Sequence, residues 1–163
     1  MNTILAVDPG THYTGYAKLD EGGLSYGLIK AGGNNWIDRC ERVAHACHSL
    51  GPTHNLVIEW PQFQPGRRGL AAARGGDTLK LAFLCGAIFG RTPNHNIHLI
   101  TPAEWKGSLP KRVTASRCQR EYGLSGRQEI DNNWIDAVML ASWFSLTKLG
   151  RELKPERFVR RDY

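Results

Sequence analysis

The first thirty residues of the chain contain three strand-like segments that are joined by short turns. Residues 2–8 and 13–20 flank a glycine-containing turn, and residues 24–31 follow a turn signal at 20–23. Strands joined by turns this short must run antiparallel, because a parallel connection needs a crossover of about a dozen residues or more. The chain is therefore expected to begin with an antiparallel three-stranded sheet.

The remaining chain alternates between helical and strand-like patterns. Apolar residues recur at helical spacing over 36–50, 77–90, 110–122 and 133–149, and a single helical turn is expected at 103–106. Short apolar runs at 55–61 and 97–102 predict two more strands, and strands separated by helices pair in parallel. We expect an α/β fold with a mixed five-stranded sheet, three antiparallel strands followed by parallel ones, and helices on both faces.

Length and charge indicate the number of domains and the class of partner. The 163 residues suffice for one hydrophobic core, which we place in residues 1–150, and residues 151–163 are expected to form a basic, solvated C-terminal tail. The net charge of +6 favours an anionic partner such as nucleic acid. No run of apolar residues approaches the length of a membrane span, and no basic segment precedes the first strand, so we expect a cytoplasmic protein.

The cysteines admit two interpretations. They form no CxxC pair, and a reducing compartment would keep them as thiols. Cys40, Cys47 and His48 together are compatible with a metal site. Cys40 and Cys47 also share an apolar helical stripe with Val43 and Leu50, which favours burial in the core.

Two acids stand at the ends of predicted strands. Asp8 ends the first strand, in the run ILAVDPG, and Glu59 ends the fourth, in NLVIEWP. Functional sites of α/β sheets gather at the carboxyl ends of neighbouring strands. If these two strands are adjacent, both carboxylates meet at one edge of the sheet. Each acid taken alone also fits a turn or a solvated strand end.

A third acid lies on the last predicted helix. Asp136 shares one helical face with Met139, Leu140 and Trp143, and a face this apolar must point to the core. Asn133, one turn earlier, points the same way, whereas Asp131 lies off that face or precedes the helix. The alternative for Asp136 is a first-turn acid that complements the helix dipole.

Three carboxylates held together repel one another, and a divalent cation removes that cost. Hard oxygen ligands select Mg²⁺ or Mn²⁺ rather than zinc. Two such ions about 4 Å apart can activate a water and stabilise the leaving oxygen in phosphodiester cleavage. The acids Asp8, Glu59 and Asp136 therefore predict a two-metal site.

The motifs resemble, in order along nearly the whole chain, those of the RuvC-type Holliday-junction resolvases in the RNase H-like nuclease superfamily. The matching segments are ILAVDPGTHYTGYA, LVIEWPQF, TPAEWKGSLPK and DNNWIDAVMLASW, and the size resembles that of the small phage-encoded members, which act in the host cytoplasm. The resemblance implies an RNase H-like fold and a homodimer that binds four-way DNA junctions. It implies a nuclease that makes paired nicks with two Mg²⁺ or Mn²⁺ ions per active site.

The resemblance also implies roles for the acids. By position, Asp8 would bridge both metal ions, and Glu59 and Asp136 would each help to hold one. The family usually has a fourth acid or a histidine where this chain has Asn133, whose amide oxygen can ligate a hard cation but brings no charge. Asp131 or a water molecule is the alternative fourth ligand.

Other residues match the family's DNA contacts. Lys106 and, more loosely, Lys111 resemble basic residues near the scissile phosphate, although either is also compatible with a solvated surface lysine. Phe63 stands where the family has an aromatic residue that intrudes at the junction centre, or it packs within its loop. The same loop carries arginines suited to phosphate contacts, or simply to solvation, at positions Arg67, Arg68 and Arg74.

The helix at 77–90 is apolar nearly all round, with Lys80 as its interior charge. A helix of this kind needs cover on two sides, either at the centre of the fold or in a dimer interface. We expect the homodimer to form through this helix.

Three rival interpretations remain. The run DPGTHYTG is similar to the phosphate turn of actin-like kinases, but those proteins need two such domains and a second phosphate loop. A second rival is an RNase H-like nuclease that acts on other branched DNA or on RNA. A third is a catalytically impaired junction-binding protein in which Asn133 marks a lost ligand.

Overall fold

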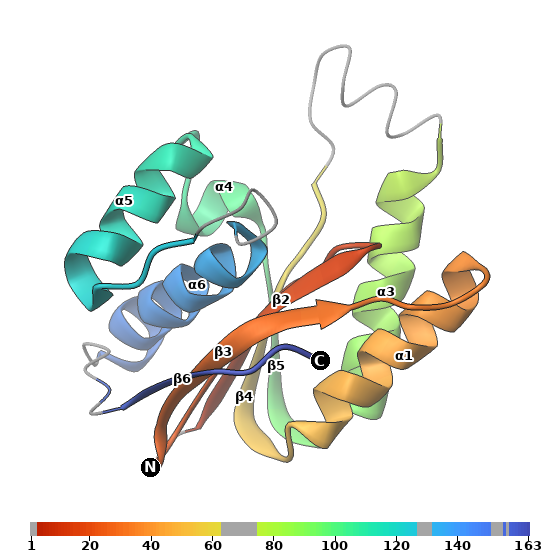
Figure 1. The fold of residues 1–163 in the computed structure, drawn as a ribbon, viewed down its shortest axis with the longest axis horizontal. Helices are drawn as coiled ribbons and strands as arrows, with labels where there is room; N and C mark the ends of the chain where they lie inside the picture. Colours follow the sequence, from red (N-terminus) through yellow and green to blue (C-terminus); the bar gives the residue numbers. More distant parts are fainter. Residues whose placement is uncertain (1–2, 63–74, 127–131, 151–154, 156) are drawn as a thin grey trace.

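The computed structural model describes residues 3–62, 75–126, 132–150, 155 and 157–163, and every structural statement below refers to these residues. The elements in chain order are β1 (Ile4–Asp8), β2 (Tyr13–Asp20), β3 (Gly23–Lys30), α1 (Trp36–Ser49), β4 (Thr53–Glu59), α3 (Asp77–Arg91), β5 (Asn94–Ile100), α4 (Pro102–Trp105), α5 (Lys111–Tyr122), α6 (Asn132–Leu149) and β6 (Phe158–Arg160). Figure 1 shows α1 and α3 on one side of the sheet and α4, α5 and α6 on the other. The expected mixed α/β architecture is confirmed.

The sheet has the strand order β5-β4-β1-β2-β3-β6. Strands β1, β2 and β3 pair antiparallel, whereas β1 pairs parallel to β4 and β4 parallel to β5. In the β1–β4 register, Val7 lies opposite Ile58. The next residue on each strand is Asp8 and Glu59, so the two acids leave the sheet side by side at the carboxyl edge.

The central strand β1 is buried on both faces, which explains why its sequence is continuously apolar. Leu5 and Val7 pack in the cluster formed with α1 and α3, and Ile4 and Ala6 pack in the cluster formed with α6. A strand held from both sides has little freedom to shift. The position of Asp8 at its end is therefore fixed by the two halves of the core.

The cysteines lie within this core. All four are buried free thiols, and Cys40 and Cys47 pack between α1 and the sheet. The neighbouring His48 bonds the carbonyl oxygen of Arg91 through Nδ1, at 2.9 Å. The structure thus favours the core interpretation of the cysteine pair over the metal site. Among the described helices, none is long and apolar enough to cross a membrane.

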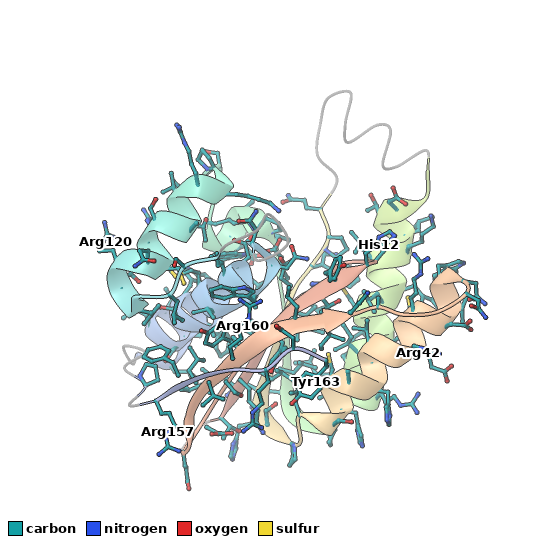
Figure 2. The ribbon with its side chains drawn as sticks, viewed as in Figure 1. His12, Arg42, Arg120, Arg157, Arg160 and Tyr163 are labelled. Carbon is teal, nitrogen blue, oxygen red and sulfur yellow. The ribbon has the colours of Figure 1, made fainter. Side chains whose placement is uncertain are left out.

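The sheet has six strands, so the expectation of five was incomplete. The sixth strand comes from 158–160, within the segment that we expected to be a solvated tail, and it pairs parallel to β3. Figure 2 shows Arg157, Arg160 and Tyr163 following one another along this border of the sheet. Beyond β6 the backbone N–H groups of Arg161 and Tyr163 continue to donate to β3 carbonyls, each at 2.8 Å.

The prediction missed this strand because it is only three residues long and lies in a segment, 151–163, that is mostly charged. Charged side chains suit an edge strand, whose side chains face water while its backbone pairs with the sheet. Two aromatic contacts anchor the segment. The ring of Phe158 lies 6.1 Å from that of Tyr122, and the ring of Tyr163 lies 5.8 Å from that of Tyr16.

A close approach of α6 to β2 depends on Gly15. A Cβ atom at Gly15 would lie 2.0 Å from the carbonyl oxygen of Asn133, in the first turn of α6. Only a glycine leaves room for the helix backbone there. The side chain of Asn133 completes the contact, since its Nδ2 donates to the carbonyl oxygen of Tyr13 at 2.6 Å. This packing carries the first turn of α6, and with it Asp136, to the carboxyl edge of the sheet.

Candidate active site

Asp8 lies at the end of β1, where water is largely excluded and other acids are near. Burial raises the pKa of its carboxyl group well above the usual value. The charges of Glu59 and Asp136 raise this pKa further. Lys106 and Lys111 act in the opposite direction but do not reverse the shift. The carboxyl edge of the sheet therefore concentrates negative charge that the protein itself balances only in part.

Glu59, at the end of β4, is held by two donors from one short segment. Trp105 Nε1 donates to Glu59 Oε2 at 2.8 Å, and Lys106 Nζ donates to the same oxygen at 3.1 Å. The Glu59 side chain is only 13% exposed. Burial raises the pKa of Glu59, and the charge of Lys106 opposes that shift.

Asp136 points inward from α6 and is 2% exposed. Lys106 Nζ donates to its Oδ2 at 2.8 Å, so a single ammonium group bridges Asp136 and Glu59. Burial alone would lower the pKa of Lys106, but the two carboxylates prevail and raise it. Lys106 is therefore a charged lysine within the acid cluster, which differs from the solvated surface lysine considered as its alternative.

The turn that delivers Trp105 and Lys106 follows from the sequence TPAEW. Pro102 is the first residue of α4, where its missing N–H costs nothing, and Thr101 precedes it as N-cap. Glu104 Oε2 accepts hydrogen bonds from the backbone N–H of Thr101 and from its hydroxyl, both at 2.7 Å. This capped turn stands directly after β5, the neighbour of β4, and so aims its last residues at Glu59.

Trp105 is the site residue that sequence reasoning missed. The available signal was the capping pattern of Thr101 and Glu104 at the end of the predicted strand 97–102, directly before a tryptophan and a lysine. An indole N–H donor that ends such a turn has a fixed direction. Trp105 carries no charge, so it does not stand out among the basic residues that resemble phosphate contacts.

The other predicted site residues occupy different places. Asn133 is tied to β2 by its hydrogen bond to Tyr13. Lys111 is exposed at the start of α5, close enough for its charge to lower the pKa of Asp8. The remaining predicted residues lie outside the described ranges, namely Phe63, Arg67, Arg68, Arg74 and Asp131.

The acid cluster fits a hard divalent cation by the chemistry of its donors. Three carboxylates converge with one contacting ammonium group, which leaves an excess of negative charge. In the described part of the chain, however, no three acidic, histidine or cysteine side chains stand ready to hold a metal ion. Lys106 contacts two of the three carboxylates, with its ammonium group between Glu59 and Asp136.

Solved structures match the fold of this chain. No protein-family model and no curated protein sequence matches the chain. Thermus thermophilus RuvC in complex with a Holliday junction substrate matches 95% of this chain and 99% of its own, with 16% identity and a TM-score of 0.61. Thermus thermophilus RuvC alone matches 94% of this chain and 99% of its own, with 17% identity and a TM-score of 0.57. The chain therefore has the RNase H-like fold of RuvC.

Proposed function

We propose that this protein is a metal-dependent endonuclease that resolves four-way DNA junctions by paired nicks. The observation that carries the proposal is the meeting of Asp8, Glu59 and Asp136 at the carboxyl edge of a RuvC-like sheet. Each acid comes from a different element, and the fold brings all three to one buried position. Buried carboxylates without sufficient counter-charge are costly, so a protein that keeps three together has a use for them.

In this proposal Asp8, Glu59 and Asp136 hold two Mg²⁺ or Mn²⁺ ions. The fourth ligand is Asn133, Asp131 or a water molecule. When bound, the ions would supply an activated water and charge stabilisation for phosphodiester hydrolysis.

DNA binding in the proposal rests on basic residues around the same edge. Lys111 is exposed beside the acid cluster and offers a phosphate contact. The phosphate and base contacts proposed for the loop after Glu59 are Phe63, Arg67, Arg68 and Arg74. The net charge of +6 agrees with a polyanionic substrate.

The test is cleavage of a labelled four-way junction in Mg²⁺ or Mn²⁺, compared with duplex, flap and RNA–DNA hybrid substrates. We expect symmetric nicks in the junction and little cleavage of the others. Preferred cleavage of flaps or hybrids would favour an RNase H-like nuclease of other specificity. Tight junction binding without cleavage at any metal concentration would favour a catalytically impaired binding protein.

Trp105→Phe should weaken the site without removing any ligand. The change deletes the indole N–H that donates to Glu59 and retains the aromatic ring. Loss of such a supporting bond costs ~10–100-fold in metal affinity or activity. We expect the nicking rate to require a higher Mn²⁺ concentration, measured as a titration at fixed junction concentration. Trp143→Phe, on α6, is the matched control, and an unchanged Mn²⁺ dependence in Trp105→Phe would contradict the role.

Helix α3 offers a surface for the proposed homodimer. Leu84, Cys85 and Ile88 on one face are buried, whereas Leu79 is 75% and Phe83 50% exposed on the other. Exposed apolar side chains gathered on one helix are typical of an interface. We propose that a second copy of the chain covers this face.

Leu79→Glu tests the proposed dimer. A charge at the interface would be buried without a partner, so we expect the variant to be monomeric at micromolar concentration by light scattering, where the wild type is dimeric. Leu146→Glu is the matched control, since Leu146 is 58% exposed on α6, across the sheet from α3. A wild-type monomer, or a dimeric Leu79→Glu variant, would contradict the proposed interface.

A further inference from the structure

The ammonium group of Lys106 occupies the centre of the acid cluster as a cation would. Its Nζ lies 3.1 Å from Glu59 Oε2 and 2.8 Å from Asp136 Oδ2. The lysine side chain is 14% exposed, and the two carboxylates are 13% and 3% exposed. The group also lies 4.6 Å from the centre of the Trp105 ring, which gives its remaining charge a partner. The ammonium group is thus held by two carboxylates and an aromatic ring.

Carboxylates that are gathered to bind a metal ion repel one another when no cation lies between them. Removing one partner from a buried ion pair leaves an uncompensated charge and is strongly destabilising. A cluster of carboxylates with no metal ion would face that cost unless another cation takes the position. Lys106 supplies such a cation from within the chain, because the capped turn of α4 fixes the start of its side chain.

We propose that Lys106 is the resident cation of the acid cluster, and that its ammonium group competes with a divalent metal ion for the position between Glu59 and Asp136. The inference rests on the proposed function, since it takes these carboxylates to be metal ligands. Magnesium binds carboxylate oxygens at about 2.0–2.1 Å, so a metal ion held by Glu59 and Asp136 would lie close to the ammonium group that contacts both carboxylates. Two cations this close repel one another, so each weakens the binding of the other.

Displacement of the Lys106 ammonium group by a metal ion would leave part of the site unchanged. Trp105 Nε1 donates to Glu59 Oε2 independently of Lys106 and keeps that carboxylate oriented. Lys106 has a long, flexible side chain, and once released its ammonium group remains tethered beside the acids. There it can contact a DNA phosphate, which is a stronger partner for it after the carboxylates have acquired a metal ion. Metal binding and the exposure of a phosphate-binding lysine are thereby linked.

The test measures metal binding by the full chain in the absence of DNA. Lys106→Met retains the aliphatic stem and removes the charge. We expect this variant to bind Mn²⁺ at least ~10-fold more tightly than the wild type by titration calorimetry, which corresponds to about 1.4 kcal/mol. Its Tm without metal should fall, and the rise in Tm caused by Mn²⁺ should be larger than in the wild type. Lys148→Met is the matched control, since Lys148 also lies over a tryptophan ring, 5.7 Å from the centre of that of Trp143, and we expect wild-type Mn²⁺ affinity.

A second measurement on the wild type does not depend on the folding of Lys106→Met. With ¹³C-labelled lysine, the Cε resonance of Lys106, assigned through Lys106→Arg, should move toward the position of exposed lysines when Mg²⁺ is added. The resonance of Lys30, an exposed residue, should stay unchanged.

The outcomes separate this inference from the proposed function. Wild-type protein that binds metal and nicks junctions, while Lys106→Met gains no affinity or the Lys106 resonance does not move, overturns the inference alone. Absence of metal binding in the wild type and in every variant overturns both. A gain in affinity together with the movement of the resonance supports the inference.

Discussion

We expect Asp8→Asn to lower the rate of junction nicking by at least ~10³-fold, which corresponds to about 4 kcal/mol of transition-state free energy. Asp8 ends the central strand, and in the proposed site it is the ligand shared by both metal ions. An amide of the same shape keeps the geometry but removes the charge. Junction binding should remain close to that of the wild type, because the proposed phosphate contacts lie elsewhere.

The stability of this variant separates loss of chemistry from loss of fold. Burial and the charges of Glu59 and Asp136 disfavour the ionised form of Asp8, so a neutral amide relieves repulsion. We therefore expect the Tm of metal-free Asp8→Asn to equal or exceed that of the wild type. Asp20→Asn, at the far end of β2, is the matched control and should nick normally. Retained nicking by Asp8→Asn would refute the assignment of the active site.

Gly15→Ala should strongly destabilise the protein. Its Cβ would lie 2.0 Å from the carbonyl oxygen of Asn133 and 2.5 Å from the amide nitrogen of Trp134. Both are backbone atoms, so α6 must move away from β2. We expect a loss of at least ~3 kcal/mol in the free energy of unfolding, at the upper end of overpacking effects. Urea unfolding of the two proteins measures this difference.

A glycine in an open position provides the control for this change. An added Cβ at Gly90, on α3, meets no atom within 4 Å. Because alanine favours helix by up to about 1 kcal/mol over glycine, Gly90→Ala should be neutral or slightly stabilising. The same substitution is thus expected to lower the free energy of unfolding at Gly15 and to leave it unchanged or raise it slightly at Gly90. An unfolding midpoint for Gly15→Ala equal to that of the wild type would show that α6 can be repositioned freely.

Much of the acid arrangement could be predicted from local sequence patterns. Asp8 and Glu59 each follow an apolar run, and both carboxylates were expected to meet if their two strands were neighbours. The structure fulfils that condition, because β1 and β4 pair in parallel. The apolar face of the last helix predicts that Asp136 points inward, and it is buried. These features depend on the periodicity of strands and helices, which a single sequence displays.

Three other features could not be predicted from local sequence patterns. The bridge made by Lys106 depends on where the end of a flexible side chain lies relative to two other elements, and no local pattern contains that information. The pairing of β6 with β3 could not be predicted because β6 has only three residues and lies within a highly charged segment. The contact between Gly15 and Asn133 joins positions far apart in the chain. The motif TGY therefore contains the glycine but does not show which element packs against it.

The pairing of β6 with β3 also determines the order in which the sheet can be completed. The backbone N–H of Leu28 donates to Asp162 Oδ1 at 2.9 Å, across a sequence separation of 134 residues. Contacts of such long range form late, because a long loop must close before they are made. Until then the hydrogen-bonding edge of β3 is bare and can pair with a strand of another chain. A chain in which β6 has not yet paired therefore exposes an additional edge for association, at β3, which the finished molecule covers.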